Sequence, residues 1–158
     1  MEPILISACL LGAACRYDGG SRPVLSVEAL MGRYQLVPVC PEQLGGLPTP
    51  REPAERQGAL VVTKSGTDVT AQYRHGAEQA LHLAKYFGCK KAVLKERSPS
   101  CGAGQIYDGS FTGTRTAADG VTAALLKENG IEVFGESDIE TLLEQAEPEA
   151  SAQEPTFF

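Results

Sequence analysis

Short apolar runs recur along the chain at intervals that predict a series of buried strands. The runs lie at residues 4–9, 35–40, 59–64, 91–96 and 131–136. Several of them are continuously apolar, and they do not alternate with polar residues. Continuous apolar runs of this length are typical of strands that are covered on both faces.

Helical periodicity separates these runs and predicts four helices, at residues 26–33, 68–88, 119–130 and 137–146. In the longest helix, small apolar residues recur at helical spacing from Ala77 to Ala84, and the pattern ends at Gly88. Gly130 supplies a similar stop signal for the third helix. Strands that alternate with helices predict an α/β fold, with a mostly parallel central sheet flanked by helices in a Rossmann-like layered arrangement.

The chain has 158 residues, a length that fits one domain, and we expect this domain to span residues 1–146. The segment 147–158 is acidic and has the composition of disorder. Two segments interrupt the α/β pattern: residues 40–58, rich in proline and glycine, and residues 97–118, rich in serine, glycine and threonine. Long loops in a compact domain are usually functional or disordered, so both are candidate site loops.

Composition narrows the class of protein. The chain is 42% hydrophobic and 22% charged, which fits a water-soluble protein, and it has no apolar run long enough to cross a bilayer. Its N-terminus carries an acid and a proline where a signal peptide has basic residues. Five cysteines, an odd number without a CxxC pair, suit a reducing compartment. We therefore expect a cytoplasmic protein without a membrane partner.

The net charge of −6 is concentrated near the C-terminus, where residues 136–158 hold seven acids and neither Lys nor Arg. The preceding residues are close to neutral and show no clustered basic face of the kind that binds nucleic acid. The global charge therefore says little about the ligand, and the sequence does not define the oligomeric state.

Three cysteines occupy equivalent positions relative to the predicted strands. Cys9 and Cys40 end the first two strands, and Cys101 follows the fourth by a few residues. Ligands of open α/β sheets bind beyond the carboxyl ends of the strands, so these thiols could converge on one site at that edge. Three thiolates could hold a zinc ion or a [4Fe–4S] cluster with one iron left open, and spacing does not distinguish the two.

Four blocks of sequence resemble the thiouracil desulfidase (desulfurase) family, small bacterial and archaeal proteins long catalogued as a domain of unknown function. The blocks, within residues 4–136, are "LISACLLGAACRYDGG", "VPVCPEQLGGLPTPREPAE", "KERSPSCG" with "IYDG", and "GVTAALLKENGIEVFGE". The resemblance implies a [4Fe–4S] cluster bound by Cys9, Cys40 and Cys101. It also implies the conversion of thiouracil to uracil, or of a thiouridine-type substrate to its oxo form.

The implied reaction is a non-redox desulfuration, in which C=S becomes C=O and sulfide is released. An open iron is a Lewis acid that suits a soft thiocarbonyl sulfur. Glu42, two residues after Cys40, is the carboxylate to which the family motif points, and it is the expected general base. Ser98 and Ser100 are further catalytic candidates, since either hydroxyl could bond substrate or a cluster sulfide, or simply cap the turn.

The remaining candidates have plainer interpretations. Cys89 reads as a structural residue, while Cys15 could line the site or play no part in it. Surface solvation is the expected role of Arg51 and Arg97, although either could orient the pyrimidine oxygen. The sequence favours a turn role for Asp18 and Asp108.

Two other functions stay open. One is a sulfur transferase that carries a persulfide on Cys101 or Cys15 without a cluster. The other is a non-enzymatic sensor that binds a metal or an iron–sulfur cluster.

Overall fold

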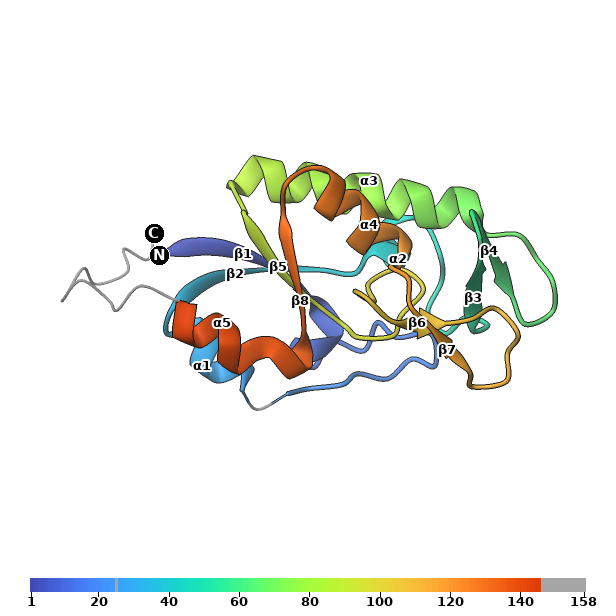
Figure 1. Ribbon diagram of the computed structural model, residues 1–158, viewed down its shortest axis with the longest axis horizontal. Coiled ribbons are helices and arrows are strands. Elements are labelled where there is room, and N and C mark those ends of the chain that lie inside the picture. The colour runs from blue at the N-terminus through green and yellow to red at the C-terminus, as the bar shows by residue number, and fades with distance from the viewer. Residues whose placement is uncertain (25, 146–158) are drawn as a thin grey trace.

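Four parallel strands form the central sheet, in the order β2-β1-β5-β8 (Figure 1). They are β1 (Glu2–Ser7), β2 (Tyr34–Val39), β5 (Lys91–Leu94) and β8 (Glu132–Gly135). The computed structural model describes residues 1–145 except residue 25, so the predicted acidic tail lies outside the described residues. The α/β fold with a mostly parallel sheet is confirmed.

Successive side chains of each central strand enter two different layers of the core. Leu5 of β1 packs with residues of α3 (Thr70–Phe87) and α4 (Val121–Glu128). Its neighbours Ile4 and Ile6 pack with residues of α1 (Val27–Met31) and α5 (Ile139–Gln145). This period-2 division explains the continuous apolar runs, because both faces of the sheet are covered by helices (Figure 1).

One predicted strand does not join the central sheet. The run 59–64 forms β4 (Leu60–Thr63), which pairs antiparallel with β3 (Ala54–Gln57) in a separate hairpin. Gly58, at φ +60°, lies in the tight turn between the two strands, and so short a connection permits only antiparallel pairing. β4 alternates exposed and buried residues, as a strand covered on one face does.

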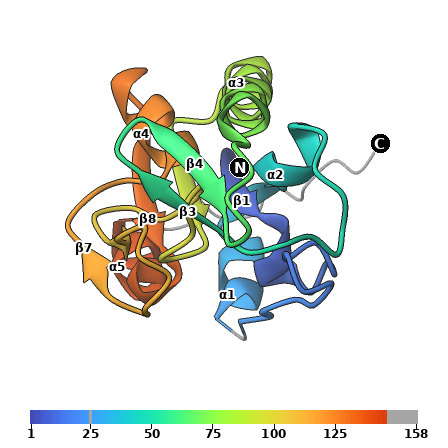
Figure 2. The same ribbon diagram turned by 90° about the vertical axis from the view of Figure 1, so that its right-hand side faces the viewer.

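The two interrupting segments contain short elements of their own. The first begins with α2 (Pro41–Leu44) and ends in β3. The second contains β6 (Ile106–Tyr107), which pairs antiparallel with β7 (Arg115–Thr116). Figure 2, which views the molecule from the carboxyl edge of the sheet, shows the hairpin of β3 and β4 in front of the strand ends and β7 to one side. They therefore cover the edge where the sequence places the site.

The strand order identifies the expected ligand position more narrowly. From β1 the chain continues to β2 on one side and then to β5 on the other side of β1. Such a reversal of direction leaves a crevice beyond the carboxyl ends of the two strands that flank it, which here are β1 and β5.

Among the described residues, no helix is both long enough and apolar enough to cross a bilayer.

Two glycines allow α2 to lie against α3. A Cβ atom at Gly76 would stand 1.8 Å from the carbonyl oxygen of Pro41, and one at Gly45 would stand 2.0 Å from that of Gln72. No side chain fits at either distance, so the two backbones are in direct contact. Because α2 begins at Pro41, this contact sets the position of the residues around Cys40 and Glu42.

Gly76→Ala should therefore destabilise the protein, although alanine has the higher helix propensity by about 1 kcal/mol. We expect the free energy of unfolding to fall by about 1–3 kcal/mol, the usual cost of overpacking. Urea denaturation measures this change. Glu78→Ala, at an exposed position of the same helix, is the control and should leave stability nearly unchanged. A more stable Gly76→Ala protein would contradict the close contact.

Candidate functional site

Cys9, Cys40 and Cys101 reach a single pocket from the ends of three neighbouring strands. Cys9 follows β1, Cys40 follows β2 directly, and Cys101 lies in the turn that follows β5. All three line one cavity of about 480 Å³ at the carboxyl edge of the sheet. The structure thus brings together three thiols that are far apart in the sequence.

Cys9 lies in a 3₁₀ turn after β1 and not in the strand itself. The sequence places Cys9 at the end of the first strand, but β1 ends at Ser7 and a 3₁₀ helix, Ala8–Leu11, follows. Gly12, in the left-handed region at φ 97°, closes this turn by donating its N–H to the carbonyls of Ala8 and Cys9. The apolar run continues beyond the strand because Leu10 is also buried.

The two candidate serines have different surroundings. Ser98 lines the pocket, and its Oγ accepts hydrogen bonds of 3.1 Å from the N–H groups of Ser100 and Cys101. Ser100 is fully buried and absent from the pocket lining, and its hydroxyl lies 2.8 Å from that of Thr122 on α4. The placement of Ser100 is therefore at odds with a catalytic role, whereas Ser98 both caps the turn and faces the site.

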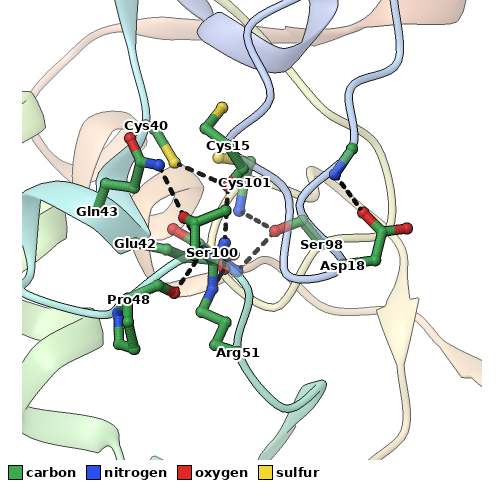
Figure 3. Close-up of polar contacts among 12 residues, drawn as sticks. Cys15, Asp18, Cys40, Glu42, Gln43, Pro48, Arg51, Ser98, Ser100 and Cys101 are labelled. Atoms are coloured by element: carbon green, nitrogen blue, oxygen red, sulfur yellow. Dashed lines mark hydrogen bonds and ion pairs between the residues drawn. The ribbon is translucent and has the colours of Figure 1, made fainter.

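A fourth thiol belongs to the same pocket. Cys15 lines it, and its carbonyl oxygen accepts a hydrogen bond from Cys40 Sγ at 3.6 Å (Figure 3). Cys89 is instead packed in the core with residues of α3 and β5, in keeping with its predicted structural role. All five cysteines are free thiols.

Glu42 is held by Arg51 and not left to solvent. Both the Nε, at 2.8 Å, and the Nη2 of Arg51 donate to Glu42 Oε2. The Glu42 side chain is only 14% exposed, and the Arg51 side chain only 7%. The prediction that Arg51 is a solvated surface residue is thus wrong, because its charge is paired with the Glu42 carboxylate inside the site. Both bonds end on Oε2, which leaves Oε1 for another partner.

Burial keeps three of the pocket thiols, those of Cys9, Cys15 and Cys101, protonated at neutral pH. Desolvation, and next the neighbouring Cys40, raise the pKa of Cys9 to about 11. Desolvation also raises the pKa of Cys15 to about 12, and it raises that of Cys101 well above its usual range. Thiolates form here when a cation replaces the protons, so metal binding would release protons from the pocket.

Ser7 is a site residue that the sequence did not reveal. Its Oγ accepts the N–H of Lys95 at 2.9 Å, which ties the carboxyl ends of β1 and β5 together. Its hydroxyl also donates to Cys101, which lowers the pKa of that thiol against the larger effect of burial. A serine that ends a buried apolar strand two residues before a candidate ligand was the available signal.

The two predicted turn residues form turns. Asp18 Oδ1 accepts the N–H of Gly20 at 2.8 Å, and Asp108 Oδ1 accepts the N–H of Ser110 at 2.9 Å. Figure 3 shows the Asp18 turn at one side of the site. These hydrogen bonds lower the pKa of both carboxyl groups and favour the ionised form.

The donor set fits an iron–sulfur cluster better than a single ion. Within the part of the chain that the structure describes, no three His, Cys, Asp or Glu side chains are grouped closely enough to hold one metal ion. A cluster takes its thiolates on different irons, so its ligands stand farther apart. In addition, Arg16 Nη1 is buried without a hydrogen-bond partner and lines the pocket, where an anionic group would accept its proton.

The fold and pocket define an α/β protein with a thiol-lined site at the switch point of its sheet. A family model described as 2-thiouracil desulfurase matches residues 4–138, and the chain belongs to this family. The uncharacterized protein YbbK of Bacillus subtilis (strain 168) is 44% identical over 150 residues, which cover 89% of this chain and 99% of that protein. A solved structure described as the [4Fe-4S]-dependent thiouracil desulfidase TudS is 52% identical, with a TM-score of 0.87 over 90% of this chain and 95% of that chain.

Replacing Ser100 tests its buried position. Ser100→Ala leaves the Thr122 hydroxyl without its buried partner, so the free energy of unfolding should fall by about 1–3 kcal/mol. Thermal or urea denaturation measures the change. Thr141→Ala, at an exposed position of α5, should not lower stability. An unchanged stability for Ser100→Ala would show that the pair with Thr122 is not formed in solution.

Proposed function

We propose that this protein is an iron–sulfur enzyme that hydrolyses the C=S bond of thiolated pyrimidines. The overall change is C=S plus water to C=O plus hydrogen sulfide, with no electrons supplied. The observation that carries the proposal is the convergence of Cys9, Cys40 and Cys101 on one pocket, in a chain 52% identical to a [4Fe-4S]-dependent thiouracil desulfidase. The substrate is a small molecule of the 2-thiouracil or thiouridine type.

Cys9, Cys40 and Cys101 would hold the cluster as thiolates. Three protein ligands leave one iron of a [4Fe–4S] cluster free to act as a Lewis acid toward a soft thiocarbonyl sulfur. Arg16 would donate to the anionic group from its buried Nη1, which lies 3.7 Å from Asp18 Oδ2 and has no hydrogen-bond partner. Ser7 would keep donating its hydroxyl proton to the Cys101 sulfur.

Glu42 would act as the general base, taking a proton from the attacking water at Oε1. Its Oε2 is engaged by Arg51, which fixes the direction of the free oxygen. Tyr73 lines the same pocket, and burial together with the neighbouring Glu42 charge raises its pKa. Tyr73 is thus a neutral donor at neutral pH, and its hydroxyl is directed at Glu42. Ser98, with both backbone contacts on its oxygen, has its hydroxyl proton available to bond a polar atom of the substrate.

The pocket does not favour the persulfide alternative. A nucleophilic cysteine needs an exposed thiol of low pKa. Cys101 and Cys15 are buried, and burial raises the pKa of both.

The five free thiols also suit a reducing compartment, so we propose that the enzyme acts in the cytoplasm.

Iron binding and turnover test the proposal together. After anaerobic reconstitution with iron and sulfide, we expect about four irons per chain and formation of uracil from 2-thiouracil. Cys9→Ser, Cys40→Ser and Cys101→Ser should each lose bound iron and activity. Cys89→Ser is the matched control, since Cys89 is equally buried but lies in the core, and it should retain both. A folded wild-type protein that binds no iron would overturn the proposal.

Glu42→Gln should separate cluster binding from chemistry. The amide keeps the size of the side chain but cannot take a proton, so kcat should fall about 10²–10⁴-fold while iron content stays at the wild-type level. Single-turnover assays under anaerobic conditions, with absorbance of the cluster, measure the two quantities on one sample. A fully active Glu42→Gln protein would remove Glu42 from the proton transfer.

A further inference from the structure

We infer that Arg51 is a positioning residue of the active site, which fixes the Glu42 carboxylate and the Cys15–Tyr17 segment relative to the cluster ligand Cys40. The inference rests on the proposed function and deepens it. Arg51 comes from the Pro/Gly-rich segment, where its two neighbours and its sequence context suggest only a loop residue. Its contacts in the folded protein indicate a more specific role than that of a loop residue.

Every nitrogen of the Arg51 guanidinium has a partner. Nε and Nη2 donate to Glu42 Oε2, Nη2 also donates to the Cys15 carbonyl at 3.1 Å, and Nη1 donates to Pro48 and Thr49. Figure 3 shows the side chain between Glu42, Pro48 and Cys15. The backbone N–H of Arg51 adds a bond of 2.7 Å to the carbonyl of Tyr17. One side chain thus joins three separate segments.

The guanidinium cannot be replaced by a simple positive charge. Lysine carries a single ammonium on a flexible chain and cannot reach a carboxylate and two backbone carbonyls in one plane. The Arg51 side chain is only 7% exposed and all but one of these bonds are partly buried, so a lost partner would leave a polar group poorly solvated. The arrangement is therefore specific for arginine.

The Cys15 carbonyl links Arg51 to the cluster ligand. This oxygen accepts from both Cys40 Sγ and Arg51 Nη2. When Cys40 binds iron as a thiolate it has no proton to donate, so only the bond from Arg51 remains on this oxygen. Arg51 thereby keeps the Cys15–Tyr17 segment in place, and Glu42 directed, in the loaded enzyme.

Arg51→Lys tests this role through the separation of kcat from KM. We expect kcat for 2-thiouracil to fall about 10–100-fold, because a displacement of about 1 Å in a catalytic group costs this much. KM should change less than twofold and iron content should stay at the wild-type level. Arg51→Gln can still donate to a carbonyl but cannot form an ion pair with the carboxylate, so its kcat should fall at least as much. This second variant replaces Arg51→Lys in the test if Arg51→Lys does not fold.

Arg56→Lys is the matched control. Arg56 also donates to backbone carbonyls, those of Gly58 and Asp119, but it is absent from the pocket lining. Arg56→Lys should therefore keep wild-type kcat and iron content. Equal losses in the Arg51 and Arg56 variants would show a general loop effect and overturn the inference.

A double variant shows whether Arg51 acts through Glu42. In the Glu42→Gln background, Arg51→Lys should lower the residual kcat by less than twofold, since the group it positions no longer takes a proton. A full additional loss would overturn the inference. A wild-type enzyme that binds iron without turnover would instead contradict the proposed function, and an Arg51→Lys protein with wild-type kcat would contradict only the role of Arg51.

Discussion

The position of β1 at the centre of the sheet is the constraint on which the site depends. β1 pairs in parallel with β2 on one side and β5 on the other, so three carboxyl ends meet at one edge. Each end is followed by one of the three cysteines. Ser7 reinforces this arrangement, because its oxygen accepts the N–H of Lys95 just beyond β5. A one-residue slip between these strands would turn the residues that follow them toward the other face.

The electrostatics of the pocket combine neutral and charged groups in a buried space. The thiols of Cys9 and Cys101 are protonated because burial disfavours the thiolate, and the Glu42 charge is balanced by Arg51. Among the described residues, Arg16 alone has a buried side-chain nitrogen without a hydrogen-bond partner, and its nearest carboxylate is that of Asp18 at 3.7 Å. An anionic cluster held by the proposed thiolates would account for both features, since iron would replace the thiol protons and the cluster would accept a hydrogen bond from Arg16.

The sequence predicts the central fold well because the sheet is covered on both faces. Continuous apolar runs marked all four of its strands, and small residues at helical spacing marked α3. The run 59–64 has the same composition, but only one face of β4 is buried, and a two-residue connection through Gly58 commits it to a hairpin. Composition alone does not distinguish a strand of the central sheet from one strand of such a hairpin.

The convergence of the cysteines could be predicted because each follows the end of a strand. The contacts of the polar residues could not be predicted. Ser98 and Ser100 are indistinguishable by sequence position, yet only Ser98 faces the pocket, since Ser100 is turned toward Thr122 on α4. Likewise, Arg51 reads as a solvated loop residue until the loop is folded back on Cys15 and Tyr17. These contacts join segments more than twenty residues apart, and local sequence patterns carry no information about them.

The loops that carry the proposed catalytic groups are held to one another by side chains rather than by the sheet. Cys15, Cys40 and Glu42 are joined through Arg51, and α2 is positioned by backbone contact with α3 at Gly45 and Gly76. The sheet therefore sets where the thiols emerge, while these contacts set how Glu42 faces them. Because the two depend on different interactions, a substitution among the loop contacts would disturb the proposed proton transfer by Glu42 and leave the proposed iron ligands in place.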